Sequence, residues 1–140
     1  HLNVKLVKDL TYNVMQCCDA IITASGTATL EIALMGIPNC ITYRIAPLSY
    51  AILKRMVKID HIGLVNIVAE KEIVKELIQK DATATKILKE LNIYMNNKEL
   101  TNSISHDYIE IRELLGKQSA CKTASNIIYN KFLTLKYLLK

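Results

Sequence analysis

An apolar segment, a turn of small residues and a helical segment follow one another in residues 20–38, which read AIITASGTATLEIALMGIP. A short strand that breaks at Ser25-Gly26-Thr27 and continues as a helix exposes backbone N–H groups at a positive helix end. No bulky side chain at this turn would keep an anion away. Ser25 and Thr27 can either donate hydroxyl hydrogen bonds to that anion or cap the helix. We expect phosphate binding at this turn, with turn geometry and capping as the structural alternative.

Glu31 lies four residues after Thr27, one turn further along the same face of the expected helix. A carboxylate at this place can accept hydrogen bonds from sugar hydroxyls. It closes no simple capping box, because Leu30 and Ala28 occupy the positions three residues after Thr27 and Ser25. The alternative is a solvated carboxylate that interacts with the helix dipole. A phosphate-binding turn beside a carboxylate that accepts hydrogen bonds from sugar hydroxyls would suit a nucleotide.

Strand-like and helix-like segments alternate with short connections in the first half of the chain. Strands are predicted at 4–7, 20–23 and 39–43, with a fourth beginning at 62–64, and helices at 12–18, 27–35 and 48–57. This alternation is typical of an α/β fold with a Rossmann-like parallel sheet and flanking helices. From residue 70 on we expect no strand, and helices at 70–79, 83–94, 103–115 and 123–139. We interpret the chain as one domain, with an α/β part at 1–69 and a helical part at 70–140.

Ligands of open parallel sheets bind beyond the carboxyl ends of the strands. At that edge we expect the following residues to collect: Ser25, Gly26, Thr27, Tyr43, Arg44 and Asn66.

Four segments that occur in one order at tight spacing resemble lipid-A-disaccharide synthases. They are Ser25-Gly-Thr-Ala-Thr-Leu-Glu31, Ile41-Thr-Tyr43-Arg44-Ile-Ala-Pro47, Leu53-Lys54-Arg55-Met-Val-Lys58 and Leu64-Val-Asn66-Ile-Val-Ala69-Glu70. The specific resemblance covers roughly residues 4–79 and continues as a looser helical pattern. One departure is that the family usually has Leu-Pro-Asn where this chain has Leu64-Val65-Asn66. Without the proline, we expect a looser loop around Asn66.

The resemblance implies an inverting glycosyltransferase of two Rossmann-like domains that uses no metal and no cofactor. It implies transfer of a diacylglucosamine from UDP-2,3-diacylglucosamine to 2,3-diacylglucosamine 1-phosphate. In such proteins the C-terminal domain holds the nucleotide sugar, and this chain resembles part of that domain. A chain of 140 residues that begins with His1 fits this interpretation. We therefore expect a fragment that is inactive alone.

The resemblance also implies roles for the candidate residues. Arg44 would stabilise the charge that grows on departing UDP. Lys54 and Arg55 either contact phosphate or substrate, or simply face water. Asn66 either bonds the uracil edge or the diphosphate through its amide, or only shapes its loop.

No catalytic base is assigned. An inverting sugar transfer needs a group that takes the proton of the attacking hydroxyl. Asp60, His61 and Glu70 are the local candidates, but the resemblance implies that the acceptor site lies in the absent N-terminal half. We also expect no metal site.

The last segment of the chain is basic and apolar. Residues 117–140 contain five lysines and no acidic residue, and the whole chain has a net charge of +5. An apolar stripe runs through Ile128, Phe132, Leu135 and Leu139. This helix either packs on the protein or on a second subunit, which would make a homo-oligomer, or lies on an anionic membrane. In either case Lys122, Lys136 and Lys140 would face solvent or anionic lipid.

Other patterns narrow the location and the partners. No apolar run is long enough to span a membrane, so we expect a soluble or peripheral protein. The resemblance implies a cytoplasmic protein, peripheral at the inner face of the bacterial inner membrane. Aromatic residues make up only 6% of the chain, which argues against nucleic-acid binding. The cysteines form no metal-binding spacing, and we expect them reduced and mostly buried: Cys17, Cys18, Cys40 and Cys121.

Two functions of other classes stay open. A sugar-nucleotide epimerase of the same two-domain architecture also has a Ser-Gly turn followed by a helical glutamate, although the segments around Tyr43-Arg44 and Asn66 match the transferase better. The second is a non-catalytic module that would serve oligomerisation or membrane docking through the C-terminal helices.

Overall fold

The computed structural model of the chain describes residues 3–46, 49–50, 60–116 and 119–138. Its strands are β1 (Ile21–Thr23), β2 (Asn39–Tyr43) and β3 (Glu76–Ile78). Its helices are α1 (Thr11–Gln16), α2 (Thr27–Leu34), α4 (Leu64–Ala69), the short 3-10 helix η1 (Gln79–Asp81), α5 (Ala84–Asn96), α6 (Lys98–Leu115) and α7 (Ala120–Leu138).

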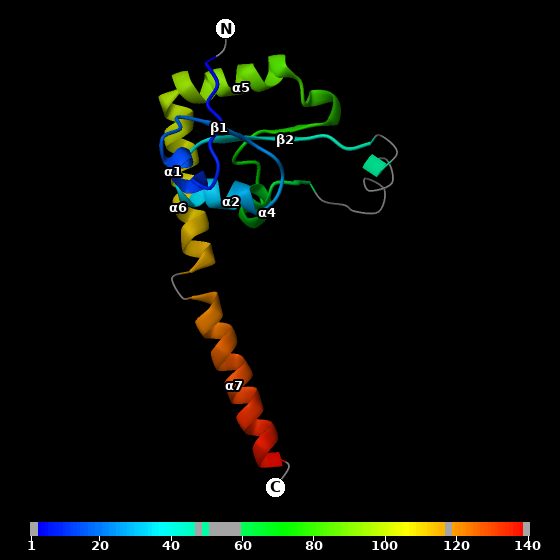
Figure 1. The fold of residues 1–140 in the computed structure, drawn as a ribbon, viewed down its shortest axis with the longest axis vertical. Coiled ribbons are helices and arrows are strands. Elements are labelled where there is room, and N and C mark those ends of the chain that lie inside the picture. Colours follow the sequence, from blue (N-terminus) through cyan, green and yellow to red (C-terminus); the bar gives the residue numbers. More distant parts are fainter. Residues whose placement is uncertain (1–2, 47–48, 51–59, 117–118, 139–140) are drawn as a thin grey trace.

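The three strands form one parallel sheet in the order β1-β2-β3. Ile21 pairs with Asn39 at one end of β1, and Tyr43 pairs with Ile78 at the far end of β2. In Figure 1, α5 lies on one side of the sheet and α2 and α4 lie on the other. The expected α/β fold, a parallel sheet with flanking helices followed by a helical segment, is confirmed.

The amino end of β2 is hydrogen-bonded to α6. Tyr108 of α6 is buried and donates a hydrogen bond from its hydroxyl to Asn39 Oδ1, 3.0 Å away, at the start of β2. Arg112 of the same helix donates to the carbonyl of Leu34, the last residue of α2. These contacts hold the C-terminal end of α2 at the amino end of the sheet, so its N-terminal end lies toward the carboxyl edge.

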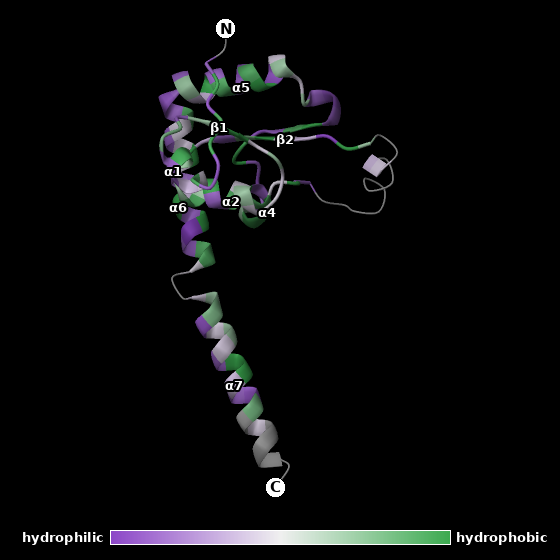
Figure 2. Cartoon of the chain, viewed as in Figure 1, coloured by the Kyte–Doolittle hydropathy of each residue, from purple (hydrophilic) through white to green (hydrophobic). Residues whose placement is uncertain are grey.

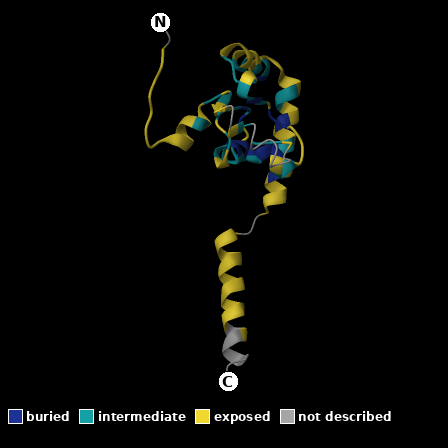
Figure 3. Cartoon of the chain, turned by 90° about the vertical axis from the view of Figure 1, so that its right-hand side faces the viewer, coloured by how far each residue is buried: buried dark blue, intermediate teal, exposed yellow. Residues whose placement is uncertain are grey.

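The core lies between the sheet and the helices. Ile41 and Val65 are fully buried, and Cys40 beside them has its thiol pKa raised to about 11, mainly by burial. The buried Tyr94 of α5 accepts a hydrogen bond from the Lys75 amide at 3.1 Å, and burial raises its phenol pKa. Figure 3 shows the buried residues gathered in this part of the chain.

The predicted helix at 70–79 is wrong. The segment bends after α4 and then forms β3, which pairs with β2 along its length. Ile73, Val74 and Leu77 are buried, a spacing that fits a short strand with a bend as well as a helix. Pairing with β2 decides between the two, so one strand of the sheet lies within the part that we expected to be all helical.

Two of the predicted strands are absent. Residues 4–7 are exposed and have no strand assignment, with Leu6 at 99% exposure. Instead of the expected strand at 62–64, residues 62 and 63 belong to a loop that ends at Gly63, the N-cap of α4, and Leu64 begins that helix. The predicted helix at 48–57 lies largely outside the described residues.

The helix α7 carries apolar and basic side chains without burying them. Ile128 and Phe132, two residues of the expected apolar stripe, are 69% and 63% exposed. Figure 1 shows α7 extending away from the sheet, and Figure 2 shows green and purple residues mixed along it. Packing of these two side chains on the body of this chain is therefore excluded in this structure. The side chains of Leu135, Lys136, Leu139 and Lys140 lie outside the described set.

The expectation of mostly buried cysteines is wrong for three of the four. Cys17 and Cys121 are exposed, Cys18 is half-buried and only Cys40 is buried. Cys17 and Cys121 lie on segments that contribute no residue to the core, at the end of α1 and in α7. Within the described residues, no helix combines the length and the apolar character that crossing a membrane requires.

Candidate functional site

The carboxyl edge of the sheet carries the turn that follows β1 and the end of β2. Thr23, the last residue of β1, pairs with Ile41 of β2. Ser25 and Tyr43 each lie two residues further along their own segments, so the parallel register brings both to the same edge. Arg44 follows Tyr43, and both side chains are exposed. The structure therefore brings the Ser25 turn and the Tyr43-Arg44 pair to the same edge of the sheet.

Gly26 gives the turn its shape. It is the N-cap of α2 with φ 131° and ψ −162°, a conformation that strongly favours glycine. A Cβ built at this position would meet no atom within 4 Å, so the space beside the backbone is open. No side chain caps α2, and its first turn holds no acidic residue. An anion can therefore approach the positive end of α2 at Gly26 without displacing a cap.

Ser25 and Thr29 tie this turn to the neighbouring loop and helix. Ser25 Oγ donates to the carbonyl of Ile62 at 2.6 Å. Thr29, which is fully buried, donates to the Gly26 carbonyl at 2.8 Å and accepts from the Val65 amide at 3.3 Å. The hydroxyl proton of Ser25 is thus used within the chain, and its oxygen keeps acceptor capacity only. Thr27, by contrast, is exposed at the start of α2.

Glu76 of β3 accepts hydrogen bonds from the same loop, which precedes α4. Its carboxylate accepts from the amides of Ile62 and Gly63, each at 2.9 Å, and from Asn66 Nδ2 at 2.9 Å. A Cβ on Gly63 would clash with Ile41 Cδ1, so the loop is packed directly on β2. Glu76 was not among the predicted site residues, because residues 70–79 were expected to be helical.

Asn66 is a structural residue in this conformation. It lies in α4 and is fully buried, and its Nδ2 donates to the Val74 carbonyl at 2.8 Å as well as to Glu76. Its Oδ1 accepts from the amides of Ile73 and Val74 at 2.9 and 3.1 Å. All the hydrogen-bonding capacity of the amide is used inside the chain. The expected loop position of Asn66 is wrong, and we do not place it among the nucleotide contacts proposed below.

Glu31 is half-buried on α2, one turn after Thr27. Tyr12 of α1 donates from its hydroxyl to Glu31 Oε2 at 3.0 Å. This hydrogen bond and the charge of Glu31 raise the pKa of Tyr12. Tyr12 was not predicted as a site residue, since it lies 19 positions before Glu31 and no local motif joins the two.

Gln79 is a further residue at this edge that the sequence did not indicate. It follows β3 directly, with φ 53°, a backbone conformation that is uncommon for residues with a side chain. Its Nε2 is buried with no hydrogen-bond partner among the described residues. Lys54 and Arg55, the two expected basic contacts, lie outside the described residues.

The three local candidates for a base are spread over α4 and its preceding loop. Asp60 is exposed and His61 half-buried, next to the Ile62 carbonyl that Ser25 bonds. Glu70 is exposed at the C-cap of α4, the opposite end of the helix from Gly63. None of them is assigned a catalytic role.

One cluster of potential metal ligands occurs among the described residues, formed by His106, Asp107 and Glu110 of α6. Both carboxylates are paired with Lys71, at 2.6 and 3.5 Å. This cluster is an ion-pair network between the segment after α4 and α6.

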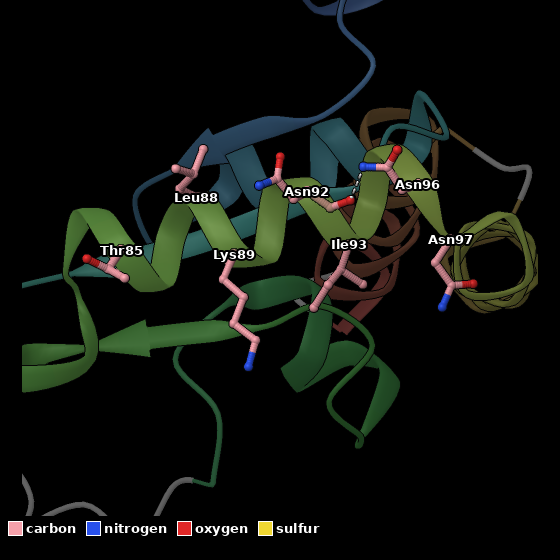
Figure 4. A pocket seen from close by; sticks show the side chains of 7 residues that line it. All are labelled: Thr85, Leu88, Lys89, Asn92, Ile93, Asn96 and Asn97. Carbon is pink, nitrogen blue, oxygen red and sulfur yellow. Dashed lines mark hydrogen bonds between the residues drawn. The ribbon is translucent and has the colours of Figure 1, made fainter.

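One groove of the described surface lies on α5, not at the strand ends. It has a volume of about 560 Å³ and is lined by Thr85, Leu88, Lys89, Asn92, Ile93, Asn96 and Asn97. Figure 4 shows these side chains projecting on different sides of α5, with Asn96 bonded to the backbone of Asn92 at 2.8 Å. Side chains that diverge from one helix do not converge on a ligand, so this groove does not replace the strand-end site.

The comparisons with known proteins agree on one family. The family model described as lipid-A-disaccharide synthetase matches residues 1–130. The chain is 43% identical to the lipid-A-disaccharide synthase of Geobacter sulfurreducens over 127 residues, which cover 91% of this chain and 33% of that protein. It is 44% identical to the lipid-A-disaccharide synthase of Geobacter metallireducens, with the same coverage. A further relative from Nitrosococcus oceani is 39% identical over 82% of this chain and 30% of its own length. The chain thus spans about a third of the length of these relatives.

Proposed function

This chain belongs to the lipid-A-disaccharide synthetase family, and from that premise we propose that it supplies the UDP-binding part of a glycosyltransferase of lipid A biosynthesis. The donor would be UDP-2,3-diacylglucosamine and the acceptor 2,3-diacylglucosamine 1-phosphate, joined to give the lipid A disaccharide 1-phosphate. Because the chain spans about a third of its relatives, the acceptor site and the catalytic base are assigned to the rest of a longer protein. This chain alone would then be inactive.

The observation that carries the proposal is the open N-terminus of α2 at Gly26. An uncapped helix end with free space beside its backbone suits the diphosphate of UDP, and Thr27 adds an exposed hydroxyl. Glu31, one turn further, would accept hydrogen bonds from the ribose hydroxyls. Tyr43 and Arg44 reach the same edge from β2 and would contact the nucleotide from the other side.

In the proposed reaction, a hydroxyl of the acceptor attacks the anomeric carbon of the donor, and the bond from that carbon to UDP breaks. The charge that develops on the leaving diphosphate would be stabilised by the α2 amides and by the Arg44 guanidinium. The proton of the acceptor hydroxyl would pass to a base outside this chain, with inversion at the anomeric carbon. Lys54 and Arg55 are further proposed phosphate contacts.

The helix α7 is proposed as a docking element for the whole protein. Its exposed apolar residues Ile128 and Phe132 would cover a second subunit, or would lie on the anionic inner face of the bacterial inner membrane. The lysines of residues 117–140 would face an anionic partner or solvent at the edge of this contact. A peripheral position at that membrane would bring the enzyme to acylated substrates.

A transfer assay with the full-length protein tests the proposal. We expect the disaccharide 1-phosphate to form from the two diacylated sugars at the same rate with and without a chelator, because the helix end and Arg44 supply the positive charge. We expect Arg44→Gln to lower kcat about tenfold to a hundredfold. The control Lys98→Gln changes a charge at the start of α6 and should leave the rate unchanged. A strict requirement for magnesium or manganese, or an unaltered rate for Arg44→Gln, would contradict this account of the phosphate site.

A further inference from the structure

Tyr12 makes a contact with α2 that the packing of the fold does not require. The helix α1 contains no buried residue, and Tyr12 itself is 58% exposed. Its hydroxyl nevertheless donates to Glu31 Oε2 at 3.0 Å, across 19 residues of sequence. An exposed hydrogen bond between two side chains adds little to folding stability. We therefore expect this hydrogen bond to act mainly on the orientation of the Glu31 carboxylate.

A glutamate on a helix surface has several rotamers, and a ligand that needs one of them must first restrict the others. The Tyr12 hydroxyl favours a rotamer in which Oε2 faces α1. A carboxylate has about four lone-pair sites, so one bond from Tyr12 leaves Oε1 and part of Oε2 able to accept from a ligand. A tyrosine phenol is protonated at neutral pH, so the Tyr12 hydroxyl is a donor to Glu31 there.

We propose that Tyr12 is a positioning residue for the nucleotide site, which fixes the Glu31 carboxylate in the rotamer that accepts the sugar hydroxyls of a nucleoside diphosphate. This inference rests on the proposed function, because it takes Glu31 as the hydroxyl acceptor. Tyr12 acts through Glu31 and makes no contact with the reacting atoms.

A double-mutant cycle in the full-length protein tests this role, with the KM of the UDP-sugar donor and kcat measured for each variant. Tyr12→Phe removes one hydroxyl, and we expect it to raise KM about threefold to tenfold with kcat unchanged. In the Glu31→Gln background the same change should alter KM less than about twofold, because the orienting bond to a carboxylate is already lost. The control Asn13→Ala, an exposed neighbour on α1, should leave KM unchanged.

The outcomes separate the inference from the proposed function. If Glu31→Gln leaves KM unaltered, the proposed role of Glu31 fails, and the role of Tyr12 fails with it. If Glu31→Gln raises KM but Tyr12→Phe does not, Glu31 keeps its role and the positioning role of Tyr12 is overturned. Full additivity of the two changes, or an equal effect of Asn13→Ala, also overturns it. The midpoint of thermal unfolding should be the same for Tyr12→Phe and the unmodified protein, which excludes a loss of folding as the cause.

Discussion

Asn66 joins the segment after α4 to the sheet by using its whole amide inside the protein. It accepts from the amides of Ile73 and Val74, and donates to the Val74 carbonyl and to Glu76. Glu76 in turn holds the Ile62 amide, and Ser25 bonds the Ile62 carbonyl. A continuous series of hydrogen bonds thus runs from the interior around Asn66 to the turn beside the proposed phosphate site.

Replacement of Asn66 by alanine should destabilise this part of the protein by about 2 to 4 kcal/mol, because the two buried amides would lose their acceptor. The buried thiol of Cys40 provides the readout, since it should react with a thiol reagent only after local unfolding. We expect a lower urea midpoint for Cys40 labelling in Asn66→Ala. The control Asn92→Ala removes an exposed amide on α5 and should leave the midpoint unchanged. Equal midpoints for Asn66→Ala and the unmodified protein would show that the network contributes no stability.

Part of the candidate site could be predicted from the sequence alone. The order of Ser25, Gly26, Thr27 and Glu31 follows local geometry, because a turn and the first turns of a helix depend on near neighbours in sequence. The contacts of Tyr12 with Glu31, and of Glu76 with the Ile62 amide, join residues 19 and 14 positions apart. No periodicity or motif reports such pairs, so these contacts could be found only in the folded chain.

At the scale of the elements, the strands and helices with strong local signals were predictable. The strand β2 has the expected bounds, and α2 starts at the expected Thr27. The strand β3 was missed, because the buried positions Ile73, Val74 and Leu77 fit a helix as well as a strand. Residues 4–7 contain Val4 and Val7, which favour strands, but a strand forms only with a partner, and here they lie outside the sheet.

The helix α7 gives a prediction at this scale. Truncation of the full-length protein after Gly116 should leave the urea midpoint of Cys40 labelling unchanged, because Ile128 and Phe132 do not pack on the core of this chain. It should lower the mass in solution, because we expect the exposed apolar residues to cover a second subunit. Light scattering measures the mass, and sedimentation with anionic vesicles measures membrane binding. An unchanged mass with loss of vesicle binding would contradict the subunit contact and favour the membrane.

At the scale of the whole molecule, we propose nucleotide binding at the carboxyl edge of the sheet and a docking role for the basic helical segment. Relatives that it resembles are about three times as long, so the proposed transfer needs a second part that brings the acceptor. In this proposal the described part would bind and orient the donor. The remainder of the longer protein would bind the acceptor and supply the base.

Calorimetry of UDP binding to the full-length protein tests the central claim most directly. Glu31→Gln keeps the shape of the side chain but weakens a charge-assisted hydrogen bond to the ribose, and should cost about 1.5 to 3 kcal/mol of binding free energy. The control Glu113→Gln changes an exposed carboxylate on α6 and should bind UDP as the unmodified protein does. The account predicts an affinity for UDP about tenfold to a hundredfold lower in Glu31→Gln alone, and equal affinities in all three proteins would contradict it.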